Sequence, residues 1–195
     1  MSSRHSRQEN TRLEKLHRKA AKETPTLSFE FGVGLMFHGP IISTTLTITD
    51  EHKAVLGKAG LPIPDPVICR FLIDTGADLC MVKHEFAQAA GLKLINANSP
   101  IHGVGIDSTG KTYMGRIAFA CNSRVSPGVL HQFAIDTQIL SGELMGALLG
   151  AKLDGLIGRN VLQSFDMNYN GMTGKVEMKF IAHTTAKRLP PGTKL

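Results

Sequence analysis

The chain has 195 residues, of which 42% are hydrophobic and 19% are charged. These values predict one soluble globular domain with a sizeable core and some tail. The formal net charge of +6 is concentrated at the ends of the chain. Residues 1–25 carry seven Lys and Arg against three Glu, and residues 187–195 carry three Lys and Arg and no acid. The near-neutral body argues against a nucleic-acid-binding domain, because such a domain carries its basic residues on a folded face.

Cysteine content and hydropathy indicate the compartment. Cys69, Cys80 and Cys121 form no CxxC pair and cannot all pair with one another, which argues against a disulfide framework and fits a reducing environment. The first twenty residues lack the apolar run of a signal peptide. No stretch approaches the roughly 18 apolar residues of a spanning helix. We therefore expect a cytoplasmic protein without membrane contact, whose basic ends make at most non-specific contact with nucleic acid.

The first half of the chain predicts strands after a polar start. Residues 1–25 are polar and basic, and we expect a disordered tail there, or a marginal helix over 11–23. Strands are predicted where apolar or alternating runs are bounded by Gly- and Pro-rich loops, at residues 27–37, 41–50 and 67–73. A short helix is expected over 83–90, closed by Gly91.

The second half adds hairpins and completes the domain. A long hairpin is predicted over 100–121, a strand over 133–139 and a closing hairpin over 165–181. Residues 141–152 predict a short helix or a loop, and residues 160–164 a helical turn. The expected result is an all-β domain over residues 26–184 with two or three short helices, followed by a short basic tail over 185–195.

Asp74 is the residue best placed for chemistry. It follows the apolar run 67–73, so its carboxylate would be held at the edge of a core. Thr75 offers a hydroxyl that can lock the turn, and Gly76 lets backbone N–H groups approach the carboxylate. Two close carboxylates that share one proton can hydrolyse a peptide without a metal, because their repulsion leaves one as the base and the other as the acid. The pattern therefore indicates a peptidase with Asp74 as a catalytic carboxylate.

One chain supplies only half of such a site. Asp-Thr-Gly occurs once, since Asp136 and Thr137 are followed by Gln138, which cannot form the same tight turn. A two-lobed enzyme would need a second motif and nearly twice the length. A two-fold axis beside Asp74 would bring two carboxylates together, so we expect a homodimer.

Segments around these residues resemble the signature segments of the retropepsin-like aspartic proteases, a family that includes the retroviral proteases and bacterial single-domain relatives. They are FLIDTGADLCM at residues 71–81 and GLIGRNVL at residues 155–162. FDMNYNGMTGKVEM at residues 165–178 resembles the closing hairpin of bacterial and cellular relatives. The resemblance implies a closed or partly closed β-barrel of the acid-protease type, a homodimer, a peptide or protein substrate and no cofactor. The histidines show no metal-binding spacing, so no metal is expected.

The resemblance also implies roles for matching residues. The catalytic triplet would be Asp74, Thr75 and Gly76, with the Thr75 hydroxyls of two subunits bracing the carboxylates. The site floor and the flap hairpin that closes over the substrate would be formed by Ala77, Asp78, Gly103, Val104 and Gly105. Structural support would come from residues that pack behind the Asp74 loop, and from an arginine paired with Asp78, namely Leu156, Ile157, Gly158 and Arg159.

Two alternative functions stay open. Residues 105–112 (GIDSTGKT) match the phosphate-loop pattern of nucleotide-binding proteins, which requires a strand before it and a long helix after it. Gly115 and Pro127 interrupt any such helix. The other alternative is a retropepsin-like dimerisation or peptide-binding module with little turnover. A flap that carries Asp107, Ser108 and Lys111 in place of a compact Gly/Ile tip points to it, as do the basic ends.

Overall fold

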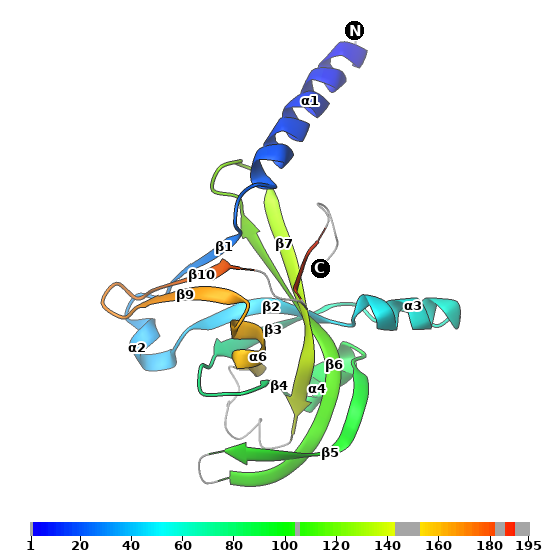
Figure 1. The fold of residues 1–195 in the computed structure, drawn as a ribbon, viewed down its shortest axis with the longest axis vertical. Coiled ribbons are helices and arrows are strands. Elements are labelled where there is room, and N and C mark those ends of the chain that lie inside the picture. Colours follow the sequence, from blue (N-terminus) through cyan, green and yellow to red (C-terminus); the bar gives the residue numbers. More distant parts are fainter. Residues whose placement is uncertain (1, 104–105, 143–152, 182–185, 190–195) are drawn as a thin grey trace.

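The structure is a computed structural model that describes residues 2–103, 106–142, 153–181 and 186–189 (Figure 1). Its centre is a closed β-barrel in which six strands follow the order β7-β4-β8-β3-β2-β6 and β6 pairs back to β7. Two more strands extend this sheet, β5 beside β6 and β11 beside β7. The bounds are β2 (Ile41–Thr47), β3 (Val67–Ile73), β4 (Cys80–Val82), β5 (Lys93–Gly103), β6 (Ile106–Asn122), β7 (Leu130–Ser141), β8 (Gly155–Ile157) and β11 (Ala186–Arg188). The predicted all-β closed barrel is confirmed.

A second, three-stranded antiparallel sheet packs on the barrel and contains β1 (Thr26–Glu30), β10 (Lys175–Phe180) and β9 (Phe165–Asn170). Four buried phenylalanines join it to the barrel. The rings of Phe133 and Phe180 stack with their centroids 4.4 Å apart, and Phe119 meets Phe165 edge-on at 5.4 Å. Such aromatic pairs add to the hydrophobic stabilisation of the shared core. The closing hairpin predicted over 165–181 therefore belongs to the same core as the barrel.

Strand β3 shows how the sequence forms the barrel. Cys69, Phe71 and Ile73 are buried, whereas Ile68 and Arg70, on the other face of the strand, are exposed. The strand pairs antiparallel with β2 and parallel with β8, so it is internal to the sheet. Its inward residues fill the barrel because side chains alternate between the two faces of a strand. The strand predicted over 67–73 has the bounds that the structure gives.

The described part of the chain holds more helix than the sequence predicted. The short helices α4 (His84–Ala89) and α6 (Arg159–Leu162) confirm predicted turns, but α2 (Gly34–His38) and α3 (Asp50–Lys58) were not predicted. The single strand predicted over 27–37 is wrong, because Gly32 at φ 53° turns the chain after β1. The strand predicted over 41–50 ends early, because the Thr49 hydroxyl accepts a hydrogen bond from the His52 amide at 3.2 Å and starts α3.

The N-terminal segment, expected to be a disordered tail or a marginal helix over 11–23, forms helix α1 (Ser2–Ala20), which projects from the barrel (Figure 1). Its last turn is held by the loop between β6 and β7, where the Ser126 hydroxyl donates to the Leu16 carbonyl at 2.9 Å. Just beyond the helix, Glu23 accepts hydrogen bonds from the Ser123 hydroxyl at 2.5 Å and the Arg124 amide at 2.8 Å. These tertiary contacts stabilise the C-terminal end of α1, because a polar helix of this length is only marginally stable in isolation.

Other expectations are settled by the strand pairings. The segment 185–195, expected to be a tail, contains β11, which pairs antiparallel with β7. Residues 106–112 of the phosphate-loop pattern lie within β6, paired with β5 and with β7, and the chain continues from them as strand to Asn122 in place of the required helix. The phosphate-loop alternative is therefore wrong.

The helix or loop predicted over 141–152 falls almost wholly outside the described residues. No described helix is long and apolar enough to span a membrane.

An ionic cluster around the buried Arg116 side chain ties α3 to the barrel. Arg116 on β6 is 3% exposed. Its Nε donates to Asp136 on β7 at 2.6 Å, and its Nη1 donates to Asp50 in the first turn of α3 at 2.6 Å. The hydrogen bond to Asp136, together with that to Asp50, raises the pKa of Arg116 despite its burial. Helix α3 is therefore fixed at its start although none of its residues is buried.

Acid is expected to weaken the attachment of α1. Partial burial of Glu23 opposes its ionisation, but hydrogen bonds from Ser123, His131 and Arg124 lower its pKa to about 2 from an ordinary 4.5. A depressed folded-state pKa gives stability that is present above about pH 4.5 and is lost as the pH falls toward 2. The Glu23→Gln variant should therefore lose less free energy of unfolding over this interval than the wild type, as measured by urea denaturation. Glu30→Gln, at an exposed site, should keep the wild-type pH dependence, and a Glu23→Gln curve parallel to the wild type would contradict the assignment.

Candidate active site

Asp74 follows β3 directly, at the point where that strand leaves the barrel. Its amide donates to the Ile157 carbonyl of β8 at 3.0 Å, and the Ala77 amide donates to the Asp74 carbonyl at 3.3 Å. One carboxylate oxygen accepts a hydrogen bond from the Gly76 amide at 2.8 Å. Within the described residues the other oxygen accepts none, and the neighbouring Thr75 and Gly76 are exposed. The carboxylate is thus oriented by the backbone, with one oxygen open to water or to a second carboxylate.

The segment after β8 holds the Asp74 turn in place. The Arg159 amide donates to the Ala77 carbonyl at 2.8 Å, and the Arg159 guanidinium donates to the carbonyls of Thr75 at 3.0 Å and Gly76 at 3.2 Å. Asp78 and Arg159 also form an ion pair. Their side chains are 80% and 55% exposed, so the pair itself adds little stability. Arg159 supports the site chiefly through the carbonyl oxygens of the turn.

Close packing of the backbone after β8 against the backbone after the Asp74 turn fixes the position of Arg159. Leu156 and Ile157 pair in parallel with Leu72 and Ile73 of β3. The chain then passes the Asp74 turn at Gly158, where an added Cβ would lie 2.5 Å from the carbonyl carbon and oxygen of Leu79. A side chain at this position therefore has no space, which explains the glycine.

Asn160 on α6 supports the site and was not predicted. Its Oδ1 accepts a hydrogen bond from the Cys80 amide at 2.9 Å. Its Nδ2 donates to the Thr137 hydroxyl at 2.7 Å and to the Gln138 carbonyl at 2.9 Å. The side chain thereby links β4 to β7, and its own amide donates to the Asp78 carbonyl at 3.1 Å. The signal in the sequence was a second polar residue, directly after Arg159, inside the largely apolar GLIGRNVL segment.

The cysteines near the motif are structural. Burial raises the pKa of the Cys69 thiol to about 12 and that of the Cys80 thiol to about 12. Both are therefore neutral at physiological pH, and the Cys80 sulfur accepts a hydrogen bond from the Gly158 amide at 3.3 Å. Among the described residues, no group of three or more His, Cys, Asp or Glu side chains is arranged to hold a metal ion.

The predicted flap corresponds to the β5–β6 hairpin, which curves away from the barrel (Figure 1). Gly103 ends β5 and pairs with Ile106 of β6. Val104 and Gly105, the predicted tip, lie outside the described residues. No contact among the described residues joins Gly103 to Asp74, so the contribution of these three residues to substrate binding stays a prediction.

Comparison with known proteins defines the class. A family model described as aspartyl protease matches residues 64–161, which is 98 of the 195 residues and includes Asp74 and Arg159. The chain therefore belongs to the aspartyl protease family, and the resemblance to its retropepsin-like members is confirmed. No curated protein matches the chain.

Two solved structures are similar to the chain. One is a retropepsin-like aspartic protease from Rickettsia conorii, with 12% identity and a TM-score of 0.44 over 81% of this chain and 93% of that one. The other is the EIAV protease complexed with the inhibitor HBY-793, with 15% identity and a TM-score of 0.35 over 73% of this chain and 88% of that one.

Replacing Gly158 by alanine should disrupt the support of the Asp74 turn. The added methyl group would overlap the Leu79 carbonyl, and overpacking of this kind costs about 2–3 kcal/mol of unfolding free energy. Urea denaturation of Gly158→Ala would measure the loss. Gly57→Ala on α3, where an added Cβ meets nothing within 4 Å, should be neutral or stabilising by less than about 1 kcal/mol. Equal effects of the two substitutions would contradict the packing argument.

Proposed function

We propose that the protein is an aspartic endopeptidase that works as a homodimer, in which each copy supplies one Asp74. The observation that carries this proposal is the oriented and partly exposed carboxylate of Asp74, in the segment that matches the aspartyl protease family. The chain has a single Asp-Thr-Gly. A two-fold axis beside that turn would complete the site with a second, identical carboxylate.

The proposed reaction uses a water molecule held between the two carboxylates. Repulsion between them keeps one ionised and the other protonated, and the pair titrates as a unit. The ionised Asp74 takes a proton from the water, whose oxygen attacks the carbonyl carbon of the peptide bond. The protonated Asp74 of the other copy donates its proton to the carbonyl oxygen. Breakage of the C–N bond, with a proton delivered to the leaving nitrogen, then releases two peptides.

The surface beside Asp74 supports the choice of a second copy of the chain as partner. Helix α2 precedes Pro40, whose carbonyl accepts a hydrogen bond from the Ile73 amide at 3.0 Å, one residue before Asp74. Around this helix the apolar side chains of Val33, Met36 and Phe37 are 80%, 76% and 69% exposed. An axis that brings two Asp74 turns together would also bring two copies of this apolar surface close together, which would bury them from water.

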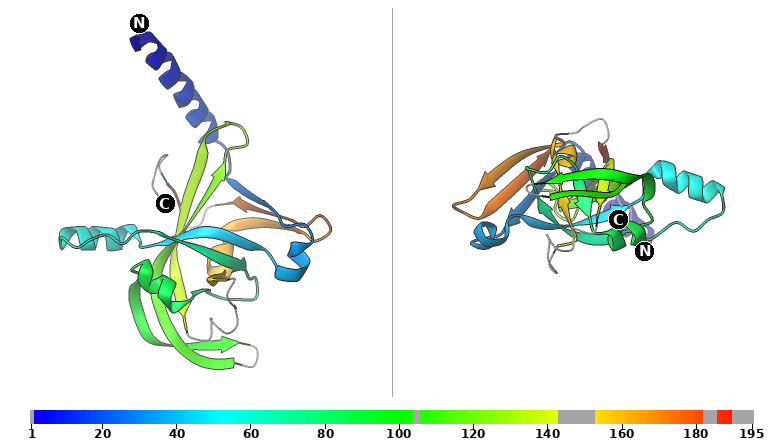
Figure 2. Two further views of the ribbon diagram at one scale, coloured as in Figure 1. Left: turned by 180° about the vertical axis from the view of Figure 1, so that it is seen from behind. Right: turned by 90° about the horizontal axis from the view of Figure 1, so that it is seen from below.

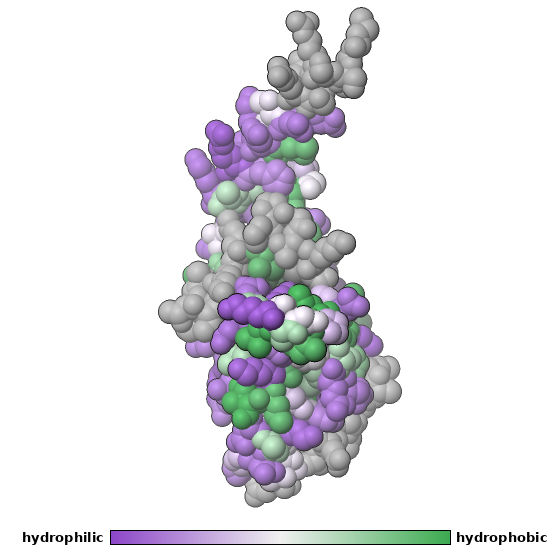
Figure 3. All heavy atoms as spheres, turned by 90° about the vertical axis from the view of Figure 1, so that its right-hand side faces the viewer, coloured by the Kyte–Doolittle hydropathy of each residue, from purple (hydrophilic) through white to green (hydrophobic). Residues whose placement is uncertain are grey.

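The other end of β2 provides a contrasting surface. Helix α3 follows that end, and the views of Figures 1 and 2 place α3 and α2 on opposite sides of the barrel. Apolar and polar side chains mix on the face that carries α3 (Figure 3). Val55, Leu94 and Ile95 are about half exposed there. This face is remote from Asp74 and is the natural place for a control substitution.

The proposed substrate is an extended peptide. The β5–β6 hairpin would cover it and pair with it through main-chain hydrogen bonds, as extended peptides do at a strand edge. In this proposal Gly103, Val104 and Gly105 contact the substrate from the hairpin, and Ala77 and Asp78 contact it from the floor of the site. Such contacts recognise the main chain of the substrate more than its side chains. Because the main chain must be extended and accessible, they favour an unfolded or flexible protein substrate.

Asp74→Asn should abolish peptide cleavage. An amide can neither take a proton from water nor share one with a second carboxylate, so the rate should fall by about 10³-fold or more. New peptide termini from a denatured protein library, identified by mass spectrometry between pH 4 and pH 8, would measure this loss. Asp166→Asn on β9, an exposed position, should retain wild-type cleavage. Cleavage by Asp74→Asn would refute the assignment, and no Asp74-dependent cleavage at any pH would favour the peptide-binding module.

Met36→Glu should weaken the dimer and, with it, the activity. A charge placed in a buried apolar contact is costly unless it is paired, so we expect a dissociation constant raised by about 10-fold to 100-fold. Analytical ultracentrifugation over a range of concentrations would measure it. Val55→Glu on α3 makes the same chemical change on the remote face and should leave the dimer intact. A wild-type chain that stays monomeric at concentrations where it cleaves peptides would overturn the homodimer.

A further inference from the structure

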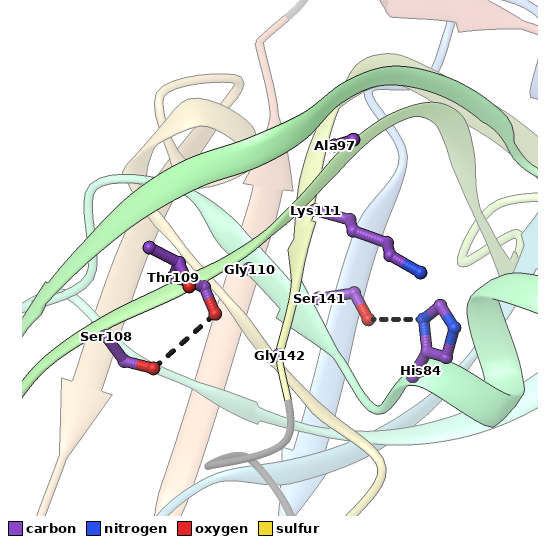
Figure 4. Close-up of a pocket in the computed structure, with 8 residues that line it drawn as sticks. All are labelled: His84, Ala97, Ser108, Thr109, Gly110, Lys111, Ser141 and Gly142. Atoms are coloured by element: carbon purple, nitrogen blue, oxygen red, sulfur yellow. Dashed lines mark hydrogen bonds between the residues drawn. The ribbon is translucent and has the colours of Figure 1, made fainter.

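A cavity of about 520 Å³ lies away from the Asp74 turn, between the body of the protein and the β5–β6 hairpin. It is lined by His84, Ala97, Ser108, Thr109, Gly110, Lys111, Ser141 and Gly142 (Figure 4). None of these described lining residues is acidic, and two of them carry basic side chains. The proposed peptidase reaction uses no group in this cavity.

Lys111 lies at the base of the β5–β6 hairpin. It pairs with Ser141, the last residue of β7, and this is the final rung of the β6–β7 ladder. From Lys111 toward Ile106, strand β6 continues with β5 as its neighbour, without β7. The lysine is exposed and has no ion-pair partner among the described residues. It therefore marks the point where the hairpin leaves the barrel.

His84 belongs to the body of the protein and is fixed by two buried hydroxyl groups. Its Nδ1 lies 3.4 Å from the Ser141 hydroxyl and 3.3 Å from the Tyr113 hydroxyl. The Lys111 side chain extends toward the His84 ring from the opposite wall of the cavity (Figure 4). The Lys111 ammonium group and the His84 imidazole thus face one cavity, and none of the described residues that line it is acidic.

Part of the phosphate-loop pattern of the sequence lines this cavity. Ser108, Thr109, Gly110 and Lys111 all belong to the pattern, and all are among the lining residues. Their backbone is a strand, so they cannot wrap a phosphate as a glycine-rich loop does. The side chains of Lys111 and Thr109 nevertheless provide an ammonium group and a hydroxyl group, which are donors that suit an oxyanion, whereas the Ser108 hydroxyl donates to the Thr109 carbonyl at 3.5 Å.

We propose that this cavity is a binding site for a phosphate-sized oxyanion, held by Lys111 from the hairpin and by His84 from the body. The volume exceeds that of inorganic phosphate and falls in the range of small-molecule sites. Both the free ion and the phosphate group of a small ester therefore satisfy the same donors. Because its two basic residues come from the hairpin and from the body, a bound oxyanion would tie the hairpin to the barrel. The proposal does not depend on the peptidase activity.

Isothermal titration of the full chain with inorganic phosphate and, separately, with adenosine monophosphate would test this site. The buffer would be phosphate-free, with ionic strength held constant by sodium chloride, because exposed charges attract any anion weakly. We expect saturable binding of at least one probe, weakened about tenfold or more in Lys111→Gln and in His84→Gln. Lys58→Gln removes the same charge at the end of α3 and should leave binding unchanged. Circular dichroism would verify that each variant is folded.

The two probes separate the possible sources of the oxyanion. Binding of both probes with similar affinity would show that inorganic phosphate alone is sufficient to fill the site. Binding of adenosine monophosphate alone would show that the site requires a small phosphate ester. Hydrogen exchange of the amides of residues 106–111 should slow when the site is filled, since the hairpin would be tied at its base. Absence of saturable binding for both probes, or equal binding by Lys111→Gln and the wild type, would overturn the proposal.

Discussion

The close approach of two backbone segments is the constraint on which the rest of the structure depends. Strand β8 fits between β3 and β4 only because its first residue, Gly155, has no side chain. An added Cβ there would lie 2.2 Å from the Met81 carbonyl and 2.6 Å from the Phe71 ring. Gly158 meets the same restriction against Leu79 at the other end of the strand. This narrow passage lets β8 pair with both β3 and β4, and it brings the start of α6 within hydrogen-bond distance of the Asp74 turn.

The same passage explains how an exposed carboxylate can be held in a fixed orientation. Side chains at the surface keep much of their rotational freedom, and exposed ion pairs restrict them weakly. Here the backbone of the turn is held instead, by the Ile157 carbonyl and by donors from Arg159. The Asp74 carboxylate needs only the hydrogen bond from Gly76 to be oriented. A rigid turn at the edge of the barrel can therefore present an acidic group to a second molecule without burying it first.

Local patterns predicted the parts of this protein that depend on short stretches of chain. The short apolar run 67–73 predicted β3, and the resemblance of the Asp-Thr-Gly and GLIGRNVL segments indicated a barrel with Asp74 supported by Gly158 and Arg159. The helices α2 and α3 were not predicted because each is set by one residue, Gly32 or Thr49, that lies inside a segment predicted as a strand. The role of Asn160 depends on Cys80, Thr137 and Gln138, which are distant in the chain, so no local pattern reveals it.

Strand β6 connects the two sites proposed for this protein. Its C-terminal part closes the barrel against β7 and holds Arg116, whereas its N-terminal part forms the hairpin with β5. A strand that continues from a packed barrel into a projecting hairpin bends most easily where its second neighbour ends, since one ladder of hydrogen bonds is lost there. That position is Lys111, at the wall of the basic cavity. Groups that bind at this point would act on both strands of the hairpin, because β5 and β6 are paired. In the two proposals, the basic cavity and the hairpin that would cover the Asp74 turn are thus linked through one strand.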